Sequence, residues 1–227
     1  MIMKFKDIYV VVPAFNEQKV IKDIIENLLK NFLNVIVVND GSSDKTLEMI
    51  KDLNIKILTH EINLGVGAAV QTGFDYVASI PNARAVITFD ADGQHNVDDA
   101  VAMAKEILIC EEGIIFGTRF PKHSKNIPKL KRIVLKLIAK ITELVTGVNL
   151  SDAHNGLKAF KVNAINELEL QFSSYSYESE LITQVAKKKI DYKEMPTDIK
   201  YTSYSIKKGQ KLLNGLLIIE DLLKLWK

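Results

Sequence analysis

Five short runs of apolar, largely β-branched residues alternate with helical patterns over the first 120 residues of the chain. Each run has the length of a strand that is buried on both faces, and one helical pattern separates it from the next. This alternation predicts a parallel sheet of the doubly wound α/β class. The runs are IYVVVPAF at 8–15, VIVVND at 35–40, IKILTH at 55–60, RAVITFD at 84–90 and GIIFGTR at 113–119.

Polar residues gather where these predicted strands end. In a doubly wound sheet, ligands bind beyond the carboxyl ends of the strands. The ends fall at residues 13–17, 39–43, 90–95 and 118–120, and each carries charged, amide or hydroxyl side chains. The sequence therefore predicts one ligand site along this edge of the sheet.

Composition limits the classes of protein that the chain can represent. Its 227 residues, 47% hydrophobic and 26% charged, suffice for one sizeable core, so we expect one domain over residues 1–227. The net charge of +2 does not predict a nucleic-acid partner. A single cysteine, Cys110, excludes an internal disulfide and fits a reducing compartment. No signal peptide or run of about 18 apolar residues is visible, so we expect a cytoplasmic location.

Two carboxylates one residue apart, Asp90 and Asp92, follow the fourth predicted strand. At a strand end they can share one hard divalent cation, for which Mg²⁺ or Mn²⁺ is the natural choice. Gly93 permits a tight turn, Gln94 offers a further oxygen ligand, and His95 is a weaker candidate. A turn with helix-capping acids is the competing interpretation of this short motif.

Two glycine-bearing stretches flank the predicted site. Asp40 in VVNDGSSDKT ends a buried strand, where its carboxylate can accept hydrogen bonds from a base or ribose, although a helix-capping turn would look the same. NLGVGAAVQTG, at 63–73, follows the third strand and lacks a third glycine, so it does not predict a nicotinamide or flavin cofactor. Its glycines still allow backbone to approach a bound nucleotide sugar.

Several motifs together resemble family 2 glycosyltransferases of the GT-A fold. They are VVPAFNE, VVNDGSSDKT, NLGVGAAVQTG, FDADGQH, GTR and DAHNGLKAF, in the order and approximate spacing of that family. Within the family, the chain is most similar to dolichyl-phosphate mannose and glucose synthases and related polyprenyl-phosphate glycosyltransferases. The resemblance covers nearly the whole chain.

The resemblance implies a set of donor-binding residues. Asp40 would read the base, and Asp90, Asp92 and Gln94 would hold Mg²⁺ or Mn²⁺ on the donor diphosphate. Phe15 stands where the family commonly has tyrosine, and Asn96 replaces the usual proline after His95. The full donor-binding set is Pro13, Phe15, Glu17, Asp40, Asn63, Gly67, Asp90, Ala91, Asp92, Arg119 and Arg132.

The resemblance also implies catalytic roles for Asp92 and Asp152. Asp152 matches the family's aspartate and is a candidate general base or acceptor-orienting group. Asn155 stands where many relatives have serine or cysteine, and His154 before it is better explained as a loop histidine. Arg119 and Arg132 match basic positions near donor and acceptor phosphates, although solvation explains Arg132 nearly as well. Glu178 and Glu180 are equal candidates for an acid that opens a helix facing the site.

Two basic amphipathic helices are predicted in the second half of the chain. One carries an apolar stripe of Leu130, Ile133, Leu137, Ile141 and Leu144, and the other carries Leu212, Leu216, Ile219, Leu223 and Trp226. Packing on the protein's own core would give the same pattern. The resemblance favours peripheral contact with the inner face of the cell membrane, or a separate membrane partner.

The resemblance implies metal-dependent, inverting transfer of a hexose from a UDP- or GDP-sugar to a polyprenyl or dolichyl phosphate. Residues 1 to about 120 would bind the donor, and the remainder would bind the acceptor. Two alternatives stay open: a saccharide or other hydroxyl acceptor with Asp152 as base, and a noncatalytic nucleotide-sugar-binding partner of a membrane protein.

Overall fold

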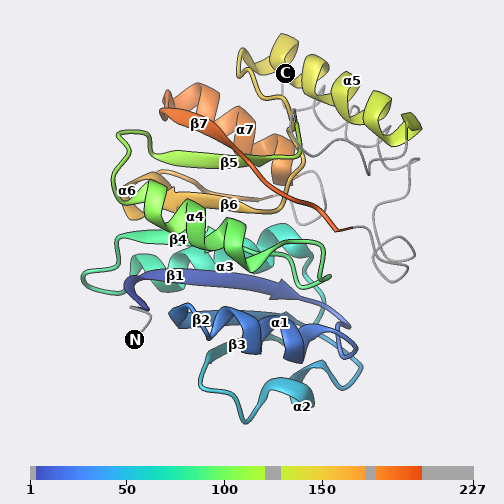
Figure 1. Ribbon diagram of the computed structural model, residues 1–227, viewed down its shortest axis with the longest axis vertical. Coiled ribbons are helices and arrows are strands. Elements are labelled where there is room, and N and C mark those ends of the chain that lie inside the picture. The colour runs from blue at the N-terminus through green and yellow to red at the C-terminus, as the bar shows by residue number, and fades with distance from the viewer. Residues whose placement is uncertain (1–3, 121–128, 172–176, 201–227) are drawn as a thin grey trace.

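A seven-stranded sheet forms the centre of the molecule (Figure 1). The computed structural model describes residues 4–120, 129–171 and 177–200, so the second predicted amphipathic helix lies outside the described residues. The strand order is β3-β2-β1-β4-β6-β5-β7. The strands are β1 (Phe5–Ala14), β2 (Phe32–Asp40), β3 (Lys56–His60), β4 (Ala85–Thr88), β5 (Ile114–Thr118), β6 (Lys158–Lys161) and β7 (Tyr192–Pro196).

Helices cover both faces of this sheet (Figure 1). Alternate residues of a strand point to opposite faces. Val10 and Val12 accordingly pack with α1 and α4 on one face, whereas Val11 packs with α3 and α7 on the other. The helices are α1 (Ile21–Leu28), α2 (Thr46–Ile50), α3 (Val66–Ala78), α4 (Val97–Ile107), α5 (Lys129–Thr146), α6 (Val162–Ile165) and α7 (Tyr177–Lys188).

The five predicted strands are confirmed in their predicted order, as strands β1 to β5 of a single α/β domain. The expectation of burial on both faces is wrong for β3, because β3 lies at the edge of the sheet and has no fully buried residue. The sheet is mainly parallel, and β6 lies antiparallel between β4 and β5. The chain returns from the carboxyl edge of the sheet at this point, which forces β6 to run in the opposite direction. The sequence did not predict β7, which pairs parallel with β5 at the edge.

Candidate active site

A cleft of about 590 Å³ lies at the carboxyl edge of the sheet, where the polar strand ends were predicted to meet. The ends of β1, β2, β4 and β5 line it, together with parts of α3, α5 and α7. Of the residues predicted to bind the donor, bind the metal or act in catalysis, Gly67, Arg132 and Asp152 lie outside its lining. The predicted residues that line it are Pro13, Phe15, Glu17, Asp40, Asn63, Asp90, Ala91, Asp92, Gln94 and Arg119.

The Asp90–Gln94 segment forms a tight turn directly after β4. Gly93 has a φ of 77°, in the left-handed region that favours glycine, as the sequence predicted. Asp92 closes the turn, because its Oδ1 accepts from the Gln94 backbone N–H at 2.9 Å and its Oδ2 accepts from the Gln94 side-chain Nε2 at 2.5 Å. Asn96 then caps α4 by accepting from the Asp98 N–H, which explains how asparagine serves in place of the family's proline.

The two carboxylates of this turn differ in their electrostatic surroundings. Burial and the neighbouring charge of Asp90 raise the pKa of Asp92 above its ordinary value. Burial acts on Asp90 as well, but the hydrogen bond with His95 and the charges of His95, Lys158 and Arg119 together outweigh it and lower the pKa of Asp90. His95 Nε2 lies 3.2 Å from Asp90 Oδ2. The turn therefore holds adjacent carboxylates whose mutual repulsion a bound cation would relieve.

The oxygen-rich character of the turn fits a divalent metal. Asp90 and Asp92 both line the cleft, and the Gln94 amide lies beside them. Among the described residues, no group of three or more His, Cys, Asp or Glu side chains forms a complete metal site. Mg²⁺ commonly takes only one or two carboxylates from a protein and completes its shell with substrate phosphates and water. Two carboxylates and an amide are therefore a suitable donor set.

Asp40 anchors the opposite wall of the cleft. Its Oδ1 lies 2.8 Å from His60 Nδ1 and accepts from the Leu64 N–H at 2.8 Å, while its Oδ2 accepts from the Gly65 N–H at 2.8 Å. His60, whose Nε2 also lies 2.9 Å from the Thr72 hydroxyl oxygen, was not predicted from the sequence. Asp40 thus fixes the backbone at the start of α3, and its predicted contact with a base stays a prediction.

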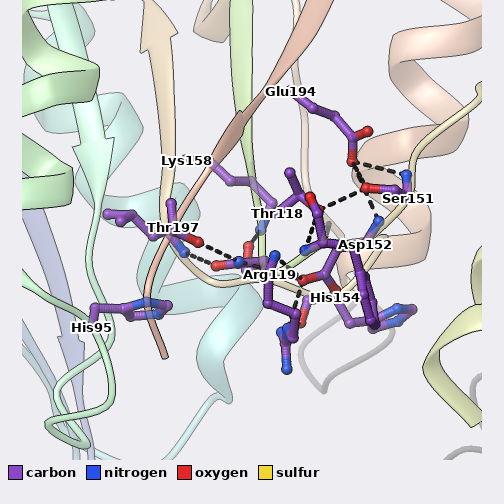
Figure 2. Close-up of polar contacts among 12 residues, drawn as sticks. His95, Thr118, Arg119, Ser151, Asp152, His154, Lys158, Glu194 and Thr197 are labelled. Carbon is purple, nitrogen blue, oxygen red and sulfur yellow. Dashed lines mark hydrogen bonds and ion pairs between the residues drawn. The ribbon is translucent and has the colours of Figure 1, made fainter. Parts of the chain in front are cut away.

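Arg119 and Asp152 form a buried ion pair beside the cleft (Figure 2). Asp152 Oδ2 accepts from Arg119 Nε at 2.5 Å and from the Arg119 backbone N–H at 3.0 Å. Arg119 Nη2 donates to the His154 carbonyl at 2.7 Å. The Asp152 side chain is 0% exposed, so its carboxylate faces the arginine and does not line the cleft. The sequence predicted both residues but not their pairing.

The other two predicted residues outside the lining both belong to helices. Gly67 is buried in the first turn of α3, one residue beyond Val66, which does line the cleft. Arg132 lies in the first turn of α5 and is half-buried. Leu135, one turn along the same helix, reaches the cleft in its place.

A buried lysine, Lys158, supports the floor of the cleft and was not predicted. Its Nζ lies 2.5 Å from Glu178 Oε2 and donates to the Asn155 carbonyl at 2.6 Å. Lys158 is 1% exposed, which is rare for lysine and requires paired charge. Gly156 also packs under the Asp90–Gln94 turn, since a Cβ there would overlap the Asp90 carboxylate. The only sequence signal for Lys158 was its place in the motif, two residues after Gly156.

The structure separates the two glutamate candidates. Glu178 lines the cleft, where burial raises its pKa and the charge of Lys158 opposes that shift. Glu180 instead accepts from the Gln171 N–H at 2.9 Å and 3.0 Å through its two oxygens, and so holds the backbone at Gln171. His154 also lines the cleft, and burial followed by the charge of Lys158 lowers its pKa to about 4.

Most of the candidate site lies within the part of the chain that one protein family matches. The sequence profile of the family "Glycosyl transferase family 2" matches residues 9–169, which include both carboxylates of the turn, Arg119 and Asp152. The chain belongs to this family. It is therefore a glycosyltransferase, and its mostly parallel sheet is that of the GT-A fold, as the sequence motifs implied.

Individual relatives of this glycosyltransferase cover most of its length. It is 35% identical to the UDP-N-acetylglucosamine–dolichyl-phosphate N-acetylglucosaminyltransferase of Methanococcus voltae, over 98% of this chain and 97% of that protein. It is 31% identical to a dolichyl-phosphate β-glucosyltransferase of Trichomonas vaginalis, over 66% of this chain and 51% of that protein.

The solved structures show the same fold at low sequence identity. Glucosyl-3-phosphoglycerate synthase from Mycobacterium tuberculosis, in complex with Mn²⁺, UDP and phosphoglyceric acid, matches with a TM-score of 0.72 and 16% identity. The match covers 97% of this glycosyltransferase and 78% of the synthase chain.

Helix α5 of the glycosyltransferase exposes much of its predicted apolar stripe. Ile133, Leu137 and Leu144 are 63%, 55% and 76% exposed. The core-facing side of the helix instead carries Ile138 and Ala139. The side chain of Leu130 lies outside the described residues. Ile141, a further residue of the stripe, is half-buried and packs against Ile138, so the stripe is divided between the surface and the protein's own packing.

Over the residues that the structure describes, each helix is too short or too polar to cross a bilayer.

Proposed function

We propose that this protein catalyses metal-dependent, inverting transfer of a hexose from a UDP- or GDP-sugar to a polyprenyl or dolichyl phosphate. In this proposal, residues 1 to about 120 supply most of the donor site, and the later residues supply the acceptor side. Asp40, Phe15 and Asn63 contact the nucleoside.

The observation that carries the choice of acceptor is the pairing of Asp152 with Arg119. A hydroxyl acceptor needs a base to take its proton, whereas a lipid phosphate is already anionic near neutral pH. The Asp152 carboxylate is fully buried outside the lining of the cleft and is bonded to Arg119, which does line the cleft. Arginine is well suited to phosphate, and the bonds from its Nε and Nη2 to Asp152 and the His154 carbonyl hold this guanidinium in place beside the cleft. This arrangement favours a phosphate acceptor.

At the donor end, Asp90, Asp92 and Gln94 are the residues that would hold Mg²⁺ or Mn²⁺. A bound metal neutralises the negative charge that develops on the leaving nucleoside diphosphate. The protein's own part is to fix the turn through the Asp92–Gln94 hydrogen bonds and to orient Asp90 with His95. Inversion of the anomeric centre follows from a single displacement by the phosphate oxygen.

The names of the relatives support the lipid phosphate and suggest the first donor to test. The relative from Methanococcus voltae, aligned over nearly its full length, is named for UDP-N-acetylglucosamine and dolichyl phosphate. The relative from Trichomonas vaginalis is named for dolichyl phosphate and glucose. UDP-N-acetylglucosamine and UDP-glucose are therefore the donors of first choice.

The exposed stripe of α5 gives a means of reaching a lipid acceptor. Ile133, Leu137 and Leu144 are exposed, and Lys136 and Lys140 on the same helix are exposed as well. An apolar face bordered by lysines suits the surface of an anionic bilayer. Leu135 of this helix lines the cleft, so the proposed membrane face and the acceptor side of the site share one element.

The test supplies purified protein with radiolabelled UDP-N-acetylglucosamine or UDP-glucose, Mn²⁺ or Mg²⁺, and one of three acceptors. Polyprenyl phosphate should give label that extracts into organic solvent, and the anomeric configuration of the product should be inverted relative to the donor. Polyprenol, the matching alcohol, and a free saccharide should give none. Transfer to either hydroxyl acceptor would contradict the proposed acceptor, and donor binding without transfer would favour the noncatalytic alternative.

Membrane contact is tested by flotation with anionic and neutral vesicles at low salt. We expect the wild type to float with anionic vesicles, and the triple variant Ile133→Ser, Leu137→Ser, Leu144→Ser to float at least about five-fold less. Ile109→Ser is the matched control, because Ile109 is 78% exposed but lies outside α5. Equal flotation of the wild type and the triple variant would contradict a membrane role for this stripe.

A further inference from the structure

Glu194 lies on β7, outside the lining of the cleft, and binds the loop that carries Asp152. Its Oε1 accepts from the Ser151 N–H at 2.8 Å, from the Ser151 hydroxyl at 2.9 Å and from the Asp152 N–H at 3.3 Å (Figure 2). One carboxylate oxygen of a half-buried glutamate thus takes three donors from two adjacent residues. All three hydrogen bonds come from Ser151 and Asp152, and Asp152 is the residue that pairs with Arg119.

The same network reaches the strand end that carries Arg119. Parallel pairing of β5 with β7 places Phe116 opposite Glu194, two residues before Thr118. The Thr118 and Ser151 hydroxyl oxygens lie 2.6 Å apart, and Arg119 follows directly in the chain. Glu194 therefore fixes Ser151, which contacts the residue before Arg119, and Asp152, which binds the Arg119 side chain.

We infer that Glu194 is a positioning residue that aims the Arg119 guanidinium into the cleft through Ser151 and Asp152. This inference rests on the proposed function for the role of Arg119 at the acceptor phosphate, whereas the contacts of Glu194 belong to the structure itself. Burial makes the carboxylate costly at this position and raises its pKa, and the hydrogen bonds from Ser151 and Asp152 offset part of that cost. A charged acceptor strengthens its hydrogen bonds to Ser151 and Asp152.

A second anchor of the same loop separates positioning from simple loop attachment. The Tyr192 hydroxyl, also on β7, accepts from the Asn149 N–H at 2.9 Å. This bond holds the loop two residues earlier and makes no contact with Asp152 or Thr118. Tyr192→Phe removes the bond and keeps the ring, so it is a matched control for loss of a loop anchor.

The test compares Glu194→Leu, Glu194→Gln and Tyr192→Phe in lipid-phosphate transfer. Displacement of a positioning group can lower a rate by as much as about 100-fold, and we expect Glu194→Leu to lower kcat/KM about 30-fold. Glu194→Gln keeps an oxygen at the Oε1 position and should stay within about three-fold of the wild type. Tyr192→Phe should be unchanged. In an Arg119→Ala background, Glu194→Leu should lower kcat/KM less than about two-fold, because the guanidinium that Glu194 positions is gone.

A spectroscopic readout judges the inference independently of activity. The sequence has only three arginines, Arg84, Arg119 and Arg132, so nitrogen-15 labelling of arginine gives few side-chain Nε–H signals, and Arg119→Lys identifies one. In the wild type this signal should exchange slowly with water, since Arg119 Nε donates to a buried carboxylate. Glu194→Leu should speed its exchange at least ten-fold, whereas Tyr192→Phe should not.

Two results would overturn the inference: an Arg119 signal that is unchanged in Glu194→Leu, or an equal loss of activity with and without Arg119. A wild type that transfers no sugar to any lipid phosphate would instead contradict the proposed function, and the exchange measurement would still decide whether Glu194 orders Arg119. Thermal unfolding of each variant shows whether the protein remains folded at the assay temperature.

Discussion

Two pairs of charged groups lie along the same edge of the sheet and are built in opposite ways. The Asp90–Asp92 turn faces the cleft, and its carboxylates stand beside each other with their repulsion only partly offset by His95. The Asp152–Arg119 pair is closed, with opposite charges in direct contact and the carboxylate fully buried. One pair has unbalanced negative charge, and the other is balanced within the protein.

This difference indicates what each pair is for. Carboxylates that face a cleft with unbalanced charge can accept a cation from outside, whereas a carboxylate matched by an internal arginine contributes geometry. Asp92 should therefore act on the donor directly, and Asp152 should act through Arg119. Variants of the two pairs and of their neighbours test this division.

Removing the open pair should have the largest effect. Asp92→Ala should lower transfer by about 1000-fold, because the charge of the leaving diphosphate loses its metal. The free energy of unfolding should stay the same or rise, since burial beside Asp90 makes the charged Asp92 carboxylate unfavourable in the folded protein. Asp98→Ala, an exposed acid in the first turn of α4, is the control and should leave transfer unchanged. Near-normal transfer by Asp92→Ala, or by the wild type in excess chelator, would contradict the metal assignment.

Breaking the ion pair beneath the open carboxylates should lower stability. Lys158→Met leaves Glu178 buried without its partner and should reduce the free energy of unfolding by about 3 kcal/mol. Lys140→Met is the matched control, because its pair with Glu143 is exposed and should contribute less than about 1 kcal/mol. Urea denaturation measures both. A similar loss in the two variants would show that the burial of Lys158 carries no special weight.

The closed pair should show a moderate effect without a change of mechanism. Asp152→Asn keeps an oxygen near Arg119 but removes the charge, and we expect kcat/KM to fall about 30-fold. The dependence of kcat/KM on pH should keep its shape, because a positioning group transfers no proton. If the acid limb of that profile disappeared in the variant, Asp152 would be a general base and the hydroxyl-acceptor alternative would regain support.

His154, which binds Arg119 through its carbonyl, gives the smallest effect, on stability against pH. Burial lowers its pKa from 6.5 to about 4, so the unfolded chain binds the proton more readily and stability falls as pH drops from 7 to 5. His154→Gln has no group that titrates here, so between pH 7 and pH 5 its free energy of unfolding should rise relative to that of the wild type by about 1 to 2 kcal/mol. Denaturation at the two pH values measures it, and parallel slopes would place His154 in contact with water.

The sequence supported the strands and the open carboxylates because both signals are local. The five strands β1 to β5 each carry their own apolar run, and Asp90, Asp92 and Gly93 lie within the turn that they form. Helix α5 was partly predictable for the same reason: its stripe was visible, but whether the stripe faced the core or not depended on packing.

The closed pair and its supports could not be predicted, because they depend on contacts between distant residues. Arg119 and Asp152 are far apart in sequence, and Glu194 reaches Asp152 from a strand that the sequence did not indicate. A sequence pattern identifies residue types at such positions, but not which of them are partners. Asp152 was therefore predicted as a candidate base when its carboxylate is bound to arginine.

The antiparallel strand β6 limits how this protein could be divided or recombined. It comes from the second half of the chain yet pairs with β4 on one side and β5 on the other, both from the first half. A fragment ending near residue 120 would contain most of the predicted donor-binding residues but would expose two unpaired strand edges across the missing strand. The two halves are thus interleaved through the sheet, and exchanging acceptor halves between relatives would require β6 to be kept with its own β4 and β5.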